Sequence, residues 1–182
     1  MRILRVKSIG VVATLAFVAL GFARMGYAVT TDATLISEAR QTVEKYRKAD
    51  PAIDSFFQNA AGYVVFPGIG KGGLGVGAAH GTGVLFENGT PLGKVTMNQV
   101  SVGLQAGGQH FSEIVFYETP KAFAEVKAGK AELAGSLSAV ALTSGAAKNA
   151  RFNHGVAVFT ATIGGLMFEA SVGGQKFDYA PF

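Results

Sequence analysis

Two groups of residues in this sequence have types and spacings that could do chemistry: a lysine among glycines, and three histidines. Lys71 lies in residues 68–73 (GIGKGG), directly after the apolar run 63–66. Glycines at positions 68, 70 and 73 have the G-x-G-x-x-G spacing, which in dinucleotide-binding proteins leads into a helix whose N–H groups face a phosphate. The first question is therefore whether the stretch binds a nucleotide.

The residues after this motif exclude the helix that a nucleotide site needs. Glycines continue at positions 75, 77, 81 and 83, and each glycine inside a helix costs about 1 kcal/mol relative to alanine. A P-loop would need glycine at Val65 and a hydroxyl residue at Gly72. We expect instead that Gly70, Lys71 and Gly72 form a turn whose N–H groups and ammonium hold a phosphate headgroup. The alternative is a solvated turn lysine.

The remaining candidates do not assemble a catalytic or metal motif. His80, His110 and His154 have no second ligand at metal spacing, and the chain has no cysteine, although three histidines could still converge in space. Residues 135–139 (GSLSA) come close to G-x-S-x-G but end in alanine, and an alternating pattern follows them. The sequence therefore predicts no catalytic residue, no metal site and no cofactor.

The charge of the chain depends on its first 28 residues. A basic start, an apolar run over residues 9–23 and the small residues Gly26 and Ala28 predict a secretory signal peptide cleaved after Ala28; the alternative is a retained anchor. Of the 16 basic and 12 acidic residues, four basic ones and no acidic one lie within residues 1–28, so 12 of each sign remain. A net charge of zero argues against nucleic acid as a partner.

The first element of the mature chain is expected to be an amphipathic helix over residues 35–49. Apolar residues recur at helical spacing from Leu35 to Tyr46, and the end of the helix is basic, with Lys45, Arg47 and Lys48. Such a helix can lie at a lipid interface, where basic residues favour anionic lipid by about 1 kcal/mol each. The alternative is a helix that packs on the core.

The remaining residues predict one α+β domain over residues 29–182. Asp50-Pro51 opens a second helix and Thr119-Pro120 a third. The predicted strands are 63–66, 73–86, 92–107, 114–117, 137–143, 156–160, 166–172 and 176–179, with turns at Asn88-Gly89 and Gly173-Gly174. Short connections favour antiparallel pairing. The expected fold is a mainly antiparallel, glycine-rich, barrel-like sheet with two N-terminal helices and one helix between two sets of strands.

The glycines have a second pattern when residues 73–83 are taken as a strand. Every second position from Gly73 to Gly83 is glycine or alanine, so one face of the strand is almost bare backbone. Glycine weakens a strand unless something must approach its backbone closely. The structural explanation is a neighbouring strand or helix packed against this face, or bends in a curved sheet. The functional explanation is a flat or elongated ligand such as an acyl chain.

Three long stretches of the chain resemble the SYLF lipid-binding domain family, which is also called an actin-binding domain. They are residues 62–86 (GYVVFPGIGKGGLGVGAAHGTGVLF), 100–118 (VSVGLQAGGQHFSEIVFYE) and 153–179 (NHGVAVFTATIGGLMFEASVGGQKFDY). The resemblance implies binding of membrane phospholipids, and for eukaryotic members phosphoinositides and actin filaments. With its predicted signal peptide, this chain is similar to the exported bacterial members, which would ordinarily meet neither.

The expected function is therefore non-enzymatic phospholipid or membrane binding in the bacterial periplasm or cell envelope, through anionic headgroups. The alternative is a structural or protein-interaction module of the envelope. The residues expected to contact lipid are Lys71, Gly70, Gly72, Lys45, Arg47 and Lys48.

Overall fold

The computed structural model describes residues 31–133 and 139–182. The predicted signal peptide, residues 1–28, lies outside the described residues. The helices are α1 (Asp32–Ala49), the 3-10 helix η1 (Pro51–Ile53), α2 (Asp54–Asn59), α3 (Pro120–Lys127) and α4 (Ala146–Asn149). The strands are β1 (Gly62–Glu87), β2 (Thr90–Tyr117), β3 (Glu132–Leu133), β4 (Val140–Ala141) and β5 (Val156–Pro181).

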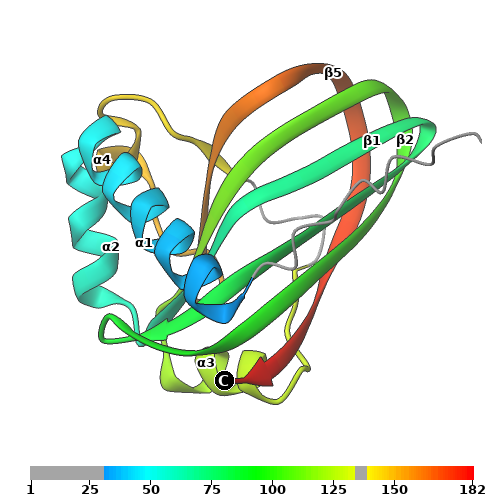
Figure 1. Cartoon of the computed structure of the whole chain (residues 1–182). Helices are drawn as coiled ribbons and strands as arrows, with labels where there is room; N and C mark the ends of the chain where they lie inside the picture. Colours follow the sequence, from blue (N-terminus) through cyan, green and yellow to red (C-terminus); the bar gives the residue numbers. More distant parts are fainter. Residues whose placement is uncertain (1–30, 134–138) are drawn as a thin grey trace, which may run out of the picture.

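The α+β class and the mainly antiparallel sheet are confirmed. The described part of the chain forms one five-stranded sheet in the order β1-β2-β5-β3, with β4 parallel to β5 (Figure 1). The sheet is strongly curved but not closed, so the barrel-like expectation is wrong in that respect. β3 and β4 are two residues each, and the curvature therefore comes almost entirely from the three long strands.

Seven of the eight predicted strands are joined into three continuous ones of 26, 28 and 26 residues. The eighth, 137–143, is shortened to β4, and its first two residues lie outside the described residues. The predicted turn at Gly173-Gly174 is wrong, because Gly173 pairs with Ser101 and Gly174 with Val100 inside the β2–β5 ladder. The predicted turn around Lys71 is also wrong, because Lys71 pairs with Gln109 inside β1. β1 and β5 each pair continuously with the central strand β2, and this pairing outweighs the local preference of glycine for turns.

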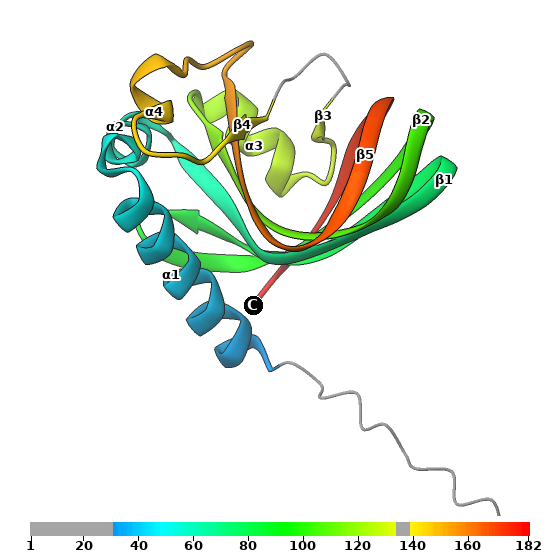
Figure 2. The same ribbon diagram turned by 90° about the horizontal axis from the view of Figure 1, so that it is seen from above.

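The curved sheet has a core on each face. On the concave side, Phe66 and Met97 pack with Phe123 of α3, and Figure 2 shows α3 and β3 lying inside the curve. On the outer side, α1 buries Leu35, Ala39, Val43 and Tyr46 against the sheet. The Tyr46 hydroxyl also donates to the backbone oxygen of Ser112 at 2.8 Å. The core-packing alternative for this helix is therefore what the structure shows.

The bare glycine face is covered by the same strand. β1 bends back so that its first part lies across its second part. A Cβ atom on Gly83 would strike the backbone oxygen of Val65, and one on Gly81 would lie 2.7 Å from Ile69 Cγ1 and 3.1 Å from the backbone oxygen of Gly68. We call this contact the β1 seam. At these two glycines the structural explanation holds, because only a strand without side chains can approach its own backbone so closely.

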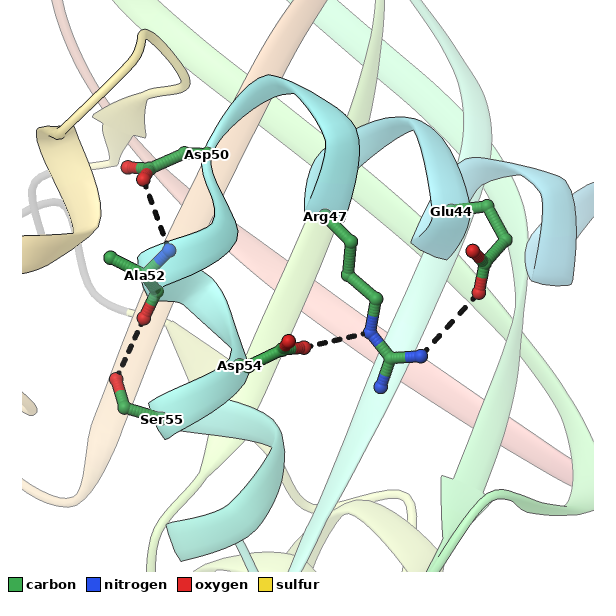
Figure 3. A network of polar contacts seen from close by, with 6 residues as sticks. All are labelled: Glu44, Arg47, Asp50, Ala52, Asp54 and Ser55. Atoms are coloured by element: carbon green, nitrogen blue, oxygen red, sulfur yellow. Dashed lines mark hydrogen bonds and ion pairs between the residues drawn. The ribbon is translucent and has the colours of Figure 1, made fainter.

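Local capping signals are formed as the sequence predicts. Asn88 and Gly89 have φ angles of 50° and 78°, as a tight hairpin turn requires. The Thr119 hydroxyl accepts a hydrogen bond from the Ala122 N–H at 3.2 Å at the start of α3. Asp50 accepts from the Ala52 N–H at 3.2 Å (Figure 3) and from the Ala147 N–H at 2.7 Å. One carboxylate thus caps η1 and also fixes α4.

Candidate functional site

The most exposed apolar side chains of the described residues gather where the three long strands bend. Leu74 of β1 is 82% exposed, Leu104 of β2 is 72% exposed and Leu166 of β5 is 91% exposed. We define the bend by these three leucines together with Val76, Val100, Val102 and Ile163, which are also more than half exposed. Figure 1 shows the bend on the side of the molecule opposite α1 and α2.

Cross-strand pairing places these side chains on one outward face. Val76 pairs with Val102, and Leu74 pairs with Ala106. Leu166 pairs with Gly108 on the other side of β2. Residues 72–86, 95–112 and 152–168 contain no Asp, Glu, Lys or Arg. The bend is therefore a convex surface of aliphatic side chains without charge, which is uncommon on a protein that exposes its surface only to water.

Polar side chains on the inner side of the bend hold its shape. Gln105 and Ser101 are 4% and 1% exposed. The Gln105 amide donates to the backbone oxygens of Ser101 at 3.0 Å and Gly75 at 3.2 Å, while Ser101 Oγ donates to the Gln105 side-chain oxygen at 2.9 Å. The pairing register shifts here, and Gly75 has a φ of +70°, which glycine adopts without strain. The bend is an ordered bulge in the sheet.

Lys71 lies beside the bend, but on the concave side. It is half-buried in β1 and close enough to the buried carboxyl of Glu113 to lower its pKa in part. Gly70 and Gly72 flank it on the outer side, and a Cβ on Gly70 would meet no atom within 4 Å. The three residues therefore do not form the predicted phosphate-holding turn. Only the two glycines border the outer surface of the bend.

Glu113 is the most unusual titratable group of the concave core. It is 1% exposed, and burial raises its pKa to about 7. The Gln175 amide donates to Glu113 Oε2 at 3.2 Å, across from the other arm of the curved sheet. Within the described residues, Glu113 Oε1 has no hydrogen-bond partner. The interaction with Gln175 thus joins the two arms of the sheet inside the molecule.

The basic end of α1 lines a groove of about 630 Å³ against the first hairpin, which we call the α1 groove. Its lining brings together the predicted Lys45, Arg47 and Lys48. The other lining residues are Ser37, Arg40, Gln41, Val43, Glu44, Tyr63, Phe86 and Gly89. The groove therefore has four cationic side chains, one carboxylate, and aromatic side chains at its base.

Arg47 is fixed within this groove by partners of its own. Its Nε lies 2.9 Å from Asp54 Oδ1, and its Nη1 lies 3.4 Å from Glu44 Oε1 (Figure 3). The guanidinium carbon is also 4.6 Å from the centre of the Phe57 ring. Arg47 thus connects α1 to α2, and its charge is largely balanced by the two carboxylates.

The histidines and carboxylates of the described residues do not assemble a metal site. His80 Nδ1 lies 2.9 Å from the Asn98 side-chain oxygen, a local contact between β1 and β2. No group of three His, Cys, Asp or Glu side chains among the described residues could hold a metal ion. None of the helices described here is long and apolar enough to cross a membrane.

Sequence reasoning missed the bend, and it missed Arg40 and Tyr63 of the α1 groove. The signal for the bend was the absence of charged residues from 72–86, 95–112 and 152–168, which lie almost entirely in three strands that meet at the bend. Alternating apolar residues in a strand usually face a core, so exposure could not be recognised without the curvature.

In comparisons with known proteins, no family model and no curated protein matches this chain. The SYLF resemblance therefore stays a prediction.

Proposed function

We propose that this protein is a non-enzymatic phospholipid-binding protein of the cell envelope, which docks on membranes through the bend. The observation that carries the proposal is the exposure of Leu74, Leu104 and Leu166 on one uncharged, outward-curving face. The resemblance to lipid-binding SYLF domains supports the same class of ligand. The preference for anionic headgroups expected from the sequence remains a prediction.

The shape and chemistry of the bend favour lipid over a protein partner. The bend is convex and aliphatic, whereas the anchors of protein interfaces are enriched in aromatic residues and arginine. β2 is paired with β5 throughout the bend and with β1 on either side of the bulge at residues 103–105, which leaves few of its backbone groups unpaired in an apolar environment. Transfer of three leucine side chains from water gains about 5–9 kcal/mol before the costs of association. This gain is sufficient for reversible binding to a bilayer.

The proposal is tested with mature protein carrying Leu74→Ser, Leu104→Ser and Leu166→Ser, singly and together. We expect each substitution to lower the affinity for phospholipid vesicles about tenfold, because each removes one inserted apolar side chain. Unfolding temperatures should change little, since the three side chains are exposed. Vesicle flotation measures the binding, and thermal unfolding by circular dichroism measures the stability.

Two controls make the result specific. Methionine at the same three positions keeps the surface apolar and should preserve binding, and Phe182→Ser removes an exposed apolar side chain away from the bend. Equal binding by the triple serine variant and the unchanged protein would refute the proposal. Loss of self-association instead of vesicle binding, measured by sedimentation, would identify the bend as an interface between protein chains.

A further inference from the structure

The α1 groove lies far from the bend and combines charge with apolar surface. Figures 1 and 2 both place α1 and the bend on different sides of the molecule. A membrane that contacts the bend therefore does not explain the chemistry of this groove.

Tyr63 is the group that makes the groove a candidate ligand site. Its side chain is 9% exposed and stacks on Phe86, with ring centres 5.2 Å apart. In the part of the chain that the structure describes, no hydrogen bond is formed by its hydroxyl. Burial raises the pKa of the Tyr63 phenol, and Arg47 and Arg40 partly offset the rise, so both guanidinium groups lie within electrostatic reach of the phenol. The hydroxyl of a largely buried tyrosine, itself accessible to solvent, thus lies near two cations.

The charges around Tyr63 select an anion. Arg40, Lys45 and Lys48 are exposed side chains of one helix, whereas Glu44 and Arg47 are already paired with each other. Arginine and lysine side chains together with a hydroxyl donor are the usual partners of phosphate oxygens. The volume of about 630 Å³ falls in the range of small-molecule sites. Val43 and Phe86 add an apolar base that a free inorganic ion would not use.

We propose that the α1 groove binds a single phosphate ester that carries an apolar chain. The phosphate is held by Arg40, Lys45 and the Tyr63 hydroxyl, and the first carbons of the chain lie against Phe86. The ligand enters as a monomer from solution, so this site is independent of membrane docking through the bend. A lipid monomer and a soluble phosphorylated metabolite share this chemistry, and the test separates them by the apolar chain.

Calorimetric titration of the mature protein with octyl phosphate, below its micelle concentration, tests the site. Inorganic phosphate and octanol serve as the two halves of the ligand. We expect octyl phosphate to bind at least tenfold more tightly than either half. Equal affinity for inorganic phosphate would reduce the groove to an anion site, and equal affinity for octanol would remove the role of the cations; either result overturns the proposal.

Variants then locate the binding. Arg40→Gln should weaken octyl phosphate binding about fivefold, as expected for an exposed ion pair, and Tyr63→Phe about tenfold, as expected for one hydrogen bond to a charged group. The control Lys121→Gln removes an exposed cation of α3 and should have no effect. Unchanged affinity in both groove variants would refute the assignment. Leu104→Ser should leave octyl phosphate binding intact, so a failure of membrane docking and a failure of this site give different results.

Discussion

At the scale of single residues, Glu113 makes the stability of the protein depend on pH. Its pKa is about 7 in the folded chain, because burial disfavours the carboxylate, against an ordinary value of 4.5. The folded state therefore binds the proton more tightly than the unfolded state. With respect to this group, the free energy of unfolding is greatest below about pH 4.5. It falls by roughly 3 kcal/mol as the pH rises from about 4.5 through 7.

Glu113→Gln removes the titration while keeping the shape of the side chain. We expect the variant to unfold at a higher temperature than the unchanged protein at pH 8, and the two to approach one another near pH 5. Thermal unfolding followed across this range measures the difference. Glu118→Gln, at an exposed position, is the matched control. Parallel pH profiles for Glu113→Gln and the unchanged protein would show that Glu113 is not a buried acid in the folded state.

At the scale of the element, the β1 seam depends on glycine at position 83. A methyl group there would strike the backbone of Val65, and backbone cannot move aside as a flexible side chain can. We expect Gly83→Ala to lower the free energy of unfolding by about 1–3 kcal/mol. Denaturant unfolding measures the change.

The same strand supplies the control for this prediction. Gly70 has open space at its Cβ position, so Gly70→Ala should change stability by less than about 0.5 kcal/mol. Equal effects at Gly70 and Gly83 would mean that the loss arises from the strand as a whole and not from the seam.

The limits of sequence reasoning follow from the same strand. The helix over residues 35–49, the starts of the next two helices at Asp50-Pro51 and Thr119-Pro120, and the Asn88-Gly89 turn were predicted because their signals are local. The fold-back of β1 was not predicted, because it brings Gly83 against Val65 only after the sheet curves. Lys71 was assigned to a turn for the same reason, since its glycine neighbours suit both a turn and a tightly curved strand. Its real environment is set by Gln109 and Glu113, which are distant in the sequence.

At the scale of the whole molecule, the position of the bend predicts one orientation on a membrane. The chain has no cysteine, so single cysteines can carry an environment-sensitive dye. We expect a dye on Leu104→Cys to report an apolar environment when vesicles are added, because Leu104 lies in the surface that we propose inserts. A dye on Lys127→Cys, at the end of α3, should report no change. A response at Lys127 without one at Leu104 would reverse the orientation and contradict docking through the bend.

The hydrogen-bonded bulge at Gly75 has a consequence for how such docking would be controlled. Loops that insert into lipid commonly have to become ordered first, and this ordering slows them and lets other signals regulate them. Here the proposed contact surface, the bend, is part of a continuous sheet and is already exposed to solvent. Membrane occupancy would then follow the amount of protein and the area of bilayer within reach, with no trigger required, and copies without a bilayer would be the ones most prone to aggregate.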